Sequence, residues 1–306
     1  MNRRTFVVRS AAALATVAGA RGVAWGQAQS SAPAVVTTFT ELRRGVGVFT
    51  ARGGSIGYLL NADGAVAVDS QYMDTAATCV AGLKTRAPKG IGLLINTHHH
   101  ADHTGGNKAF RDAVKTIVAQ ENCVAWQKRV AAQNKTEADQ AYADVAFGES
   151  WSATFGDEKV WARHHGPGHT GGDAVITFEK ADVVHMGDLL FNRAHPNIDR
   201  PAGARLRNWV RILERVEKDA SADTIFIAGH GRDNAVRCTR ADVRHFRDYL
   251  AAAVEHAEKG ARAGRSKEEV QALAVMPGFE DTVQLNQRLT LGFVLGVAYD
   301  EVTQRE

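Results

Sequence analysis

The sequence has little cysteine and little proline, and the scarcity of cysteine argues against a disulfide-rich protein and a cysteine-based metal site. Its three cysteines, Cys79, Cys123 and Cys238, stand far apart and match no zinc or redox spacing. We expect reduced thiols packed in the core, with one disulfide plus a leftover thiol as the alternative. Apart from the SSAPA segment at 30–34, no repeat or low-complexity stretch suggests a solenoid or a linker.

An excess of basic residues is also missing once the first 28 residues are set aside. This segment carries the arginine pair Arg3–Arg4, then Phe6 and a weakly apolar, alanine-rich run. It resembles a bacterial twin-arginine export signal, cleaved after the GQA segment at 26–28; an uncleaved disordered or helical N-terminus is the alternative. The run is too short to remain as a membrane anchor. Removing its four arginines lowers the formal charge from +3 to −1 and leaves no basic face for nucleic acid.

We therefore expect a periplasmic protein that meets the twin-arginine export machinery and then a small-molecule substrate, without nucleic acid and without a membrane anchor after cleavage. We predict a single α/β domain over residues 29–306, with its core at about 40–235. Predicted strands alternate with predicted helices over this core. The tail, 236–306, reads as wholly helical, with one predicted helix over 283–302. That segment is too apolar for a free helix in water. We expect this helix to pack on the body of the domain. Packing over the cleft, or on a second subunit in a dimer, are the alternatives.

One short loop concentrates potential metal ligands. The segment NTHHHADHTGGN, 96–107, directly follows a predicted buried strand and places four histidines and an aspartate within six positions. His98 and His100, two apart in an extended segment, can project to the same side and bind one ion. Asp102 and His103 can turn toward a second ion. Imidazoles with one or two carboxylates suit Zn²⁺, with Mn²⁺ or Fe²⁺ as less favoured occupants.

Further candidates stand at the ends of other predicted strands. His169 lies in GPGHTGGD, Asp188 ends the strand in VVHMGDLLF, and His230 ends the strand in TIFIAGHG. Asp69 ends an earlier strand in AVAVDS. Each residue alone is weak evidence, but the order and the shared position at strand ends indicate one constellation.

These segments together resemble the metallo-β-lactamase superfamily over about residues 46–231. The resemblance implies an αββα sandwich, two mixed sheets packed face to face with helices outside, here with a C-terminal helical extension. It implies two Zn²⁺ ions held by seven side chains: His98, His100 and His169 for the first, Asp102, His103 and His230 for the second, and Asp188 bridging both. It also implies that Asp69 holds the histidine loop without binding a metal, and that Asp102 orients the nucleophile and relays its proton.

The implied reaction is attack of a metal-bridging hydroxide on the activated carbonyl of a lactone, lactam, ester or thioester. A β-lactamase proper is an alternative, although Asp188 stands where those enzymes typically carry Cys or Ser. A mono-iron oxidoreductase like the persulfide dioxygenases and a non-catalytic periplasmic metal-binding protein are further alternatives. Metal identity separates them, because two zincs favour the hydrolase and one iron the dioxygenase. We expect substrate contacts from the loop at 191–205, through His195, Asn197 and Arg200.

Overall fold

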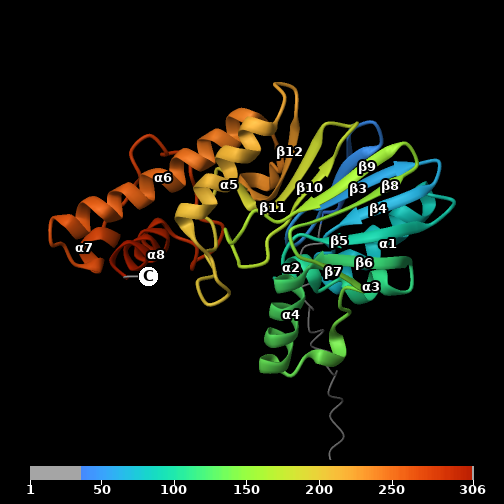
Figure 1. Cartoon of the computed structure of the whole chain (residues 1–306), viewed down its shortest axis with the longest axis horizontal. Helices are drawn as coiled ribbons and strands as arrows, with labels where there is room; N and C mark the ends of the chain where they lie inside the picture. The colour runs from blue at the N-terminus through green and yellow to red at the C-terminus, as the bar shows by residue number, and fades with distance from the viewer. Residues whose placement is uncertain (1–35, 305–306) are drawn as a thin grey trace, which may run out of the picture. The chain divides into compact units, whose positions relative to one another are not determined.

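A computed structural model describes residues 36–304 and is shown in Figure 1. The predicted export signal and its cleavage site lie outside this range. Within it, strands form a seven-stranded sheet in the order β1 to β7 and a six-stranded sheet in the order β13-β12-β11-β10-β9-β8. The first sheet consists of β1 (Thr38–Arg43), β2 (Val46–Thr50), β3 (Ile56–Asn61), β4 (Gly64–Val68), β5 (Ile91–Asn96), β6 (Val114–Gln120) and β7 (Val145–Phe147). The second consists of β8 (Ser150–Phe155), β9 (Glu158–Arg163), β10 (Val175–Phe178), β11 (Val183–Asn192), β12 (Ile225–Gly231) and β13 (Arg237–Cys238).

The helices lie outside the two sheets and beyond them at the C-terminal side (Figure 1). They are α1 (Met73–Arg86), α2 (Ala101–Thr104), α3 (Asn107–Arg111), α4 (Glu121–Asn134), α5 (Leu206–Asp219), α6 (Arg240–Arg262), α7 (Lys267–Gln271) and α8 (Leu291–Thr303), with 3-10 turns η1 (Glu137–Asp139) and η2 (Arg232–Asn234). No helix in the range 36–304 is long and apolar enough to cross a bilayer. The predicted αββα sandwich followed by a helical region is confirmed.

Strand β4 shows how the sequence makes the layers. Its segment GAVAV is buried on both faces. Val66 and Val68 belong to the core between the sheets, whereas Ala65 and Ala67 face the opposite way and pack in a second cluster with Leu83 of α1. Because alternate side chains of a strand point to opposite faces, the larger valines fill the space between sheets and the small alanines admit the helix. Strands β4 to β7 pair in parallel, and β1 to β4 pair antiparallel, so the sheet is mixed.

The second sheet is covered by α5 and α6. Trp209 of α5 is fully buried, and its indole Nε1 donates to the backbone oxygen of Leu189 at 3.0 Å. Its ring meets Phe246 of α6 at a centroid distance of 5.7 Å. Within the described range all three cysteines are buried and free, as the sequence predicts.

The predicted helix over 283–302 is wrong in its first half. Helix α8 begins only at Leu291, where the Thr290 hydroxyl caps it by accepting from the Phe293 amide at 3.1 Å. Val283 instead forms an isolated β-bridge with Ala194: its amide donates to the Arg193 oxygen at 3.0 Å, and its oxygen accepts from the His195 amide at 2.9 Å. Backbone pairing with the chain that leaves β11 overrides the helical pattern here. Helix α8 itself packs on α6 and α7, as expected for a tail docked on the body.

Candidate metal centre

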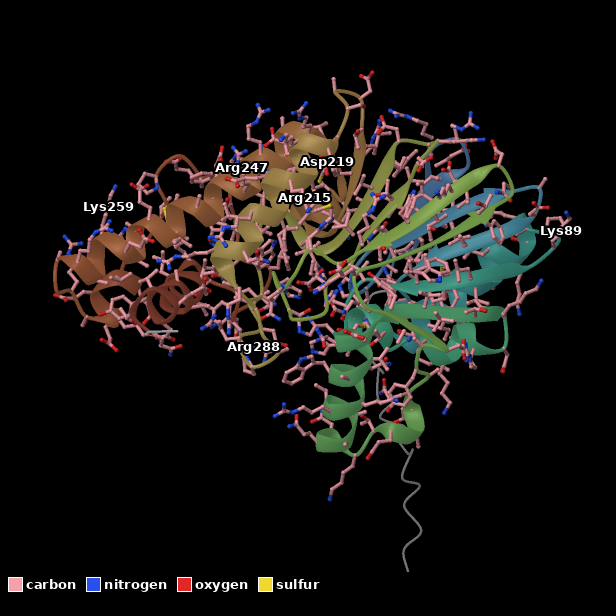
Figure 2. All side chains as sticks on the ribbon, in the orientation of Figure 1. Lys89, Arg215, Asp219, Arg247, Lys259 and Arg288 are labelled. Carbon is pink, nitrogen blue, oxygen red and sulfur yellow. The ribbon has the colours of Figure 1, made fainter. Side chains whose placement is uncertain are left out.

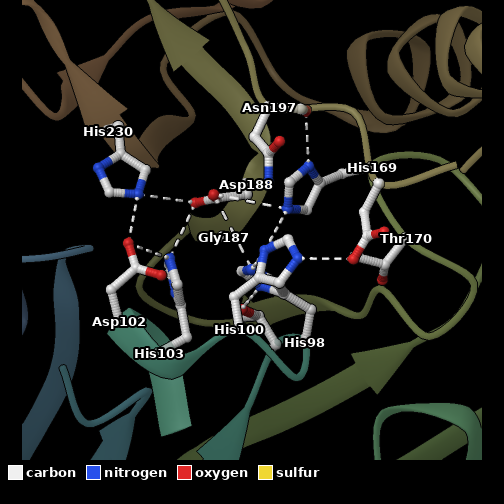
Figure 3. A network of polar contacts seen from close by, with 12 residues as sticks. His98, His100, Asp102, His103, His169, Thr170, Gly187, Asp188, Asn197 and His230 are labelled. Carbon is white, nitrogen blue, oxygen red and sulfur yellow. Dashed lines mark hydrogen bonds and ion pairs between the residues drawn. The ribbon is translucent and has the colours of Figure 1, made fainter. Parts of the chain in front are cut away.

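The proposed ligands converge at one edge of the sandwich, where strands of both sheets end (Figure 3). The histidine loop follows β5 and enters α2, His169 lies in the loop between β9 and β10, and His230 stands near the end of β12. Asp188 lies within β11, directly after Gly187, whose φ of 50° interrupts the regular pairing with β12. A Cβ at Gly187 would collide with the Thr97 side chain. Glycine at this position therefore permits the kink that turns Asp188 toward the histidines.

Three imidazole nitrogens form the first group. Nδ1 of His100 lies 3.1 Å from Nε2 of His98 and 3.0 Å from Nε2 of His169. Each ring is held through its other nitrogen. The Nδ1 of His169 donates to the backbone oxygen of Asn197 at 2.9 Å, and the Nε2 of His100 lies 2.9 Å from Oδ2 of Asp199.

The ring of His98 is also held through the nitrogen that points away from the group. Its Nδ1 lies 3.0 Å from the Thr97 hydroxyl, which itself donates to Oδ2 of Asp69 at 2.7 Å. The hydroxyl therefore accepts from His98, which puts the proton of this ring on Nδ1 as well. With all three remote nitrogens protonated, three lone pairs face one another at about hydrogen-bond distance. Such a cluster is stable when a cation lies between the nitrogens, so these residues fit a metal ion.

A second group contains Asp102, His103 and His230. Nε2 of His230 lies 3.0 Å from Oδ2 of Asp102. His103 is fully buried; its Nδ1 lies 2.7 Å from Oδ2 of Asp69, and its Nε2 lies 3.8 Å from Oδ2 of Asp102. These three side chains can also hold a metal ion.

Asp188 connects the two groups, one carboxylate oxygen to each. Oδ1 lies 3.0 Å from Nε2 of His103 and 3.4 Å from Nε2 of His230. Oδ2 lies 3.6 Å from Nε2 of His169 and 3.9 Å from Nε2 of His98. Oδ1 of Asp188 and Nε2 of His103 are buried and, despite their closeness, form no hydrogen bond. Two buried polar atoms that lie 3.0 Å apart without a hydrogen bond fit a bridging carboxylate beside a metal-bound imidazole.

The charges of the metal-free site show where positive charge is favoured. Burial lowers the pKa of His169 to about 3, so this ring is neutral and offers a lone pair. Burial by itself would lower the pKa of His230, but the carboxylates of Asp188 and Asp102 raise it to about 9. Burial would raise the pKa of Asp188, yet His230 and His103 hold it well below its usual range. The second group therefore attracts a positive charge to a point between two carboxylates, which a proton or a divalent cation can supply.

Three further aspartates hold the ligands in place, and one of them was predicted. Asp69 accepts from the backbone N–H of Thr97 and from its hydroxyl, both at 2.7 Å, and contacts His103, so it holds the histidine loop without facing a metal. The sequence interpretation missed Asp173 and Asp199. Asp173 is buried and accepts from the Thr170 hydroxyl at 2.6 Å and from the amides of Gly168 and Thr170, which fixes the loop that carries His169. The GHTGGD segment, with its aspartate four residues after the histidine, was the available signal.

His99 lies between two ligands but points to another side. Its Nε2 is 3.5 Å from Oδ2 of Asp199, and its ring lies 5.9 Å from that of Trp126. His99 thus supports the same carboxylate that holds His100 and does not face the two ligand groups.

A cavity of about 520 Å³ opens directly onto the ligands. Of the predicted substrate contacts, only Asn197 lines it. His195 is a correction: it is buried, and its Nδ1 lies 2.8 Å from the Tyr249 hydroxyl of α6. Arg200 is also a correction, because its guanidinium pairs with Glu301 of α8 at 3.2 Å. Both side chains pin the loop after β11 to the C-terminal helices instead of reaching the cavity.

Comparison with known proteins agrees with this geometry. The family model of the metallo-beta-lactamase superfamily matches residues 53–232, which include every proposed ligand. The chain belongs to the metallo-beta-lactamase superfamily. A probable metallo-hydrolase of Methanocaldococcus jannaschii is 25% identical over 57% of this chain and 86% of its own length.

Two relatives are hydroxyacylglutathione hydrolases. The protein of Rhodospirillum rubrum is 25% identical and that of Methylococcus capsulatus 26%, and the matches span only 48% and 60% of their lengths. Among solved structures, a metallo-beta-lactamase from Pontibacter korlensis has a TM-score of 0.60 at 20% identity, over 71% of this chain and 99% of that one. A sec-alkyl sulfatase variant has a TM-score of 0.67 at 15% identity, over 87% of this chain and 50% of that one. These structural likenesses show the fold alone. Family and sequence relatives together support a metal-dependent hydrolase.

Proposed function

We propose that this protein is a dinuclear zinc hydrolase that acts on an activated carbonyl compound, a lactone, lactam, ester or thioester. The single observation that carries the proposal is the position of Asp188, whose two oxygens face two separate groups of histidines. Imidazole-rich groups with one or two carboxylates favour Zn²⁺ over hard cations such as Mg²⁺ or Ca²⁺. When bound, two divalent cations that share a water lower its pKa enough to provide hydroxide near neutral pH.

Other side chains around the cavity can transfer a proton, bind the substrate carbonyl and limit the access of water. Asp102 lines the cavity, and although burial would raise its pKa, His103 and His230 lower it to about 2. A carboxylate that stays ionised at neutral pH can accept a hydrogen bond from a water, orient it and take its proton. Asn197 offers amide N–H groups next to the ligands, where they can bind a substrate carbonyl oxygen. Phe191 lies stacked on His230 with ring centroids 5.4 Å apart and limits the access of water on that side.

The relatives favour a thioester among the four substrate classes. The names of two of them describe hydrolysis of hydroxyacylglutathione. The matches leave about half of one of these proteins and two-fifths of the other unmatched, so their glutathione selectivity does not carry over to this chain. The acyl chemistry is the transferable part of the likeness.

We also propose that the protein works in the periplasm after twin-arginine export. The support is the Arg3–Arg4 pair followed by an alanine-rich run and the GQA segment at 26–28. In that compartment the enzyme's partners would be its small-molecule substrate and, before that, the export machinery.

Metal content and turnover, measured on the same preparation, test the proposed reaction. We expect two zinc ions per chain by elemental analysis, and hydrolysis of nitrophenyl esters, thioesters, a lactone or nitrocefin that is lost on chelation and restored by Zn²⁺. Full activity after exhaustive removal of metal would overturn the mechanism. One tightly bound iron with oxygen consumption on a persulfide would support the dioxygenase. Two bound metals without turnover on any class would support the non-catalytic metal-binding protein.

A further inference from the structure

The cavity has a wall that comes from outside the family match. Five of its thirteen lining residues belong to the segment 285–293, which supplies none of the proposed metal ligands. The five are Leu285, Asn286, Arg288, Leu289 and Phe293. The C-terminal segment therefore shapes the space beside the metal centre while standing apart from the machinery that the family shares.

This segment is fixed at both ends. At its start, Val283 exchanges two backbone hydrogen bonds with the chain that leaves β11. Oδ2 of Asp281 also forms an ion pair with Nε of Arg193 at 2.8 Å. At its end, Thr290 caps α8. Between these anchors the Asn286 side chain accepts from the amides of Arg288, at 2.9 Å, and Leu289, at 3.2 Å, which shapes the turn. The wall is thus a built part of the fold.

Arg288 is the only arginine or lysine among the cavity-lining residues in the described part of the chain. Its side chain is exposed and, among residues 36–304, forms no ion pair and no hydrogen bond. In the view of Figure 2, Arg288 lies between the C-terminal helices and α4. The other cavity residues of this segment include three apolar side chains, so the guanidinium stands beside an apolar wall and is free to form a charge-assisted bond to a ligand.

The charge balance of the cavity favours an anion. Its two acidic side chains, Asp102 and Asp188, both face the histidine groups, and two divalent cations would outweigh them. Arg288 adds one more positive charge with no carboxylate opposite it. A neutral substrate would leave this guanidinium unpaired, whereas an anionic substituent would give it a bidentate partner.

We infer that Arg288 selects substrates that carry a carboxylate or a similar anionic group separated by a short apolar chain from the reacting carbonyl. The inference rests on the proposed function and deepens it. The metal centre would hold the carbonyl, the wall of Leu285, Leu289 and Phe293 would contact the chain, and Arg288 would bind the anion. The cavity volume lies within the usual range for small-molecule sites, roughly 300–1,000 Å³.

A matched pair of thiols tests this inference without turnover. The probes are 4-mercaptobutanoate and 4-mercaptobutanamide, which share a metal-binding thiol and a chain and differ in the terminal charge. Calorimetric titration of the zinc-loaded full-length protein gives the ratio of their affinities. We expect the wild-type protein to prefer the carboxylate by about fivefold to tenfold at low salt, and the preference to fall as salt is raised. Arg288→Gln should reduce the ratio to near one, and Arg288→Lys should retain part of it.

Arg211→Gln is the matched control, because Arg211 is an exposed arginine of α5 that lies outside this cavity and whose loss changes the net charge equally. It should keep the wild-type ratio. Equal affinities for the two thiols in the wild-type protein, or an unchanged preference in Arg288→Gln, would overturn the inference and leave the proposed hydrolase intact. Failure of both thiols to bind the zinc-loaded protein would also overturn the inference, and the zinc content of the same preparation would show separately whether the metal centre stands.

Discussion

Nε2 of His100 lies 2.9 Å from Oδ2 of Asp199, a residue of the loop after β11. Burial opposes ionisation of this carboxyl, but its hydrogen bonds to His100 and His99 lower the pKa of Asp199 far below its usual range. The carboxylate therefore fixes the proton of His100 on Nε2 and leaves Nδ1 free for a metal ion. The histidine loop of one sheet is thus oriented by a side chain from the other.

Replacing this carboxylate should weaken the first metal site without removing a ligand. Asp199→Ala is expected to lower zinc affinity by about 10-fold to 100-fold, because His100 loses the partner that sets its tautomer and ring orientation. Competition with a chromogenic chelator measures the effect. Asp219→Ala, an exposed aspartate at the end of α5, is the control and should change nothing. Wild-type affinity in Asp199→Ala would remove Asp199 from the site.

Asp188→Ala should have a larger effect, because it removes the carboxylate that faces both groups. We expect less than two zinc ions per chain and a rate at least about 100-fold lower on whichever substrate the wild-type protein accepts. Circular dichroism checks that the variant is folded. Wild-type metal content and rate would exclude Asp188 as a bridging ligand.

Asp173 predicts a pH dependence of the metal-free protein. Burial raises the pKa of Asp173 to about 7, well above the usual range of an aspartic acid. The folded state therefore binds the proton more tightly, so this group's contribution to stability is fully present below the unfolded pKa and is lost as pH rises through about 7. Between pH 5 and 8 the free energy of unfolding should fall by up to about 3 kcal/mol from this residue.

Urea titrations of metal-free wild-type protein and Asp173→Asn at both pH values isolate that contribution. The asparagine keeps one acceptor oxygen for Thr170, loses the one that faces the Gly168 amide, and cannot ionise, so its stability should depend less on pH over this range. An equal loss in both proteins would show that Asp173 does not titrate there.

The C-terminal helices are expected to be required for a stable fold. Leu295 of α8 is fully buried in the main core, so Leu295→Ala should cost about 2–5 kcal/mol. Val275→Ala, at a half-exposed position, is the control. Truncation after Ala261 should destabilise or aggregate the protein while every proposed metal ligand remains, as thermal denaturation and light scattering would show. A soluble, fully active truncated monomer would make the tail dispensable.

The export proposal has its own test in living cells. Changing Arg3 and Arg4 together to lysine should trap the precursor in the cytoplasm, because the twin-arginine pair is what the machinery reads. Fractionation followed by immunodetection measures the distribution. Changing Arg9 and Arg21 to lysine in the same way should leave export intact. Normal periplasmic maturation of the Arg3 and Arg4 variant would contradict the assignment.

The strands and the histidine clusters were predictable because local pattern decides them. Strands such as β5 and β12 are continuous apolar runs, and their ends mark where His98 and His230 stand. Strand β8 alternates polar with apolar residues in SWSATF, a pattern typical of a half-buried strand that the sequence interpretation did not use. The start of α8 was misplaced because Val283 pairs with Arg193 and His195, 90 and 88 positions away in the chain.

Side-chain direction in the loop after β11 was not predictable. His195, Asn197 and Arg200 share one loop, yet only Asn197 reaches the cavity. The other two turn to Tyr249 and Glu301, 54 and 101 residues along the chain, and no local rule selects such partners. Asp199 was missed for the same reason, since its role depends on a histidine 99 residues away.

The two ligand groups draw on both sheets, since the loop after β5 leaves one sheet whereas β11 and β12 belong to the other. A bound ion therefore links the two sheets, and it must be released when the chain unfolds. A metal that binds only the folded chain stabilises it by about 2.7 kcal/mol when its free concentration is 100 times the dissociation constant. Proteases that degrade transiently unfolded chains would then remove metal-starved protein faster. Zinc supply would set the amount of this protein in the cell as well as its activity.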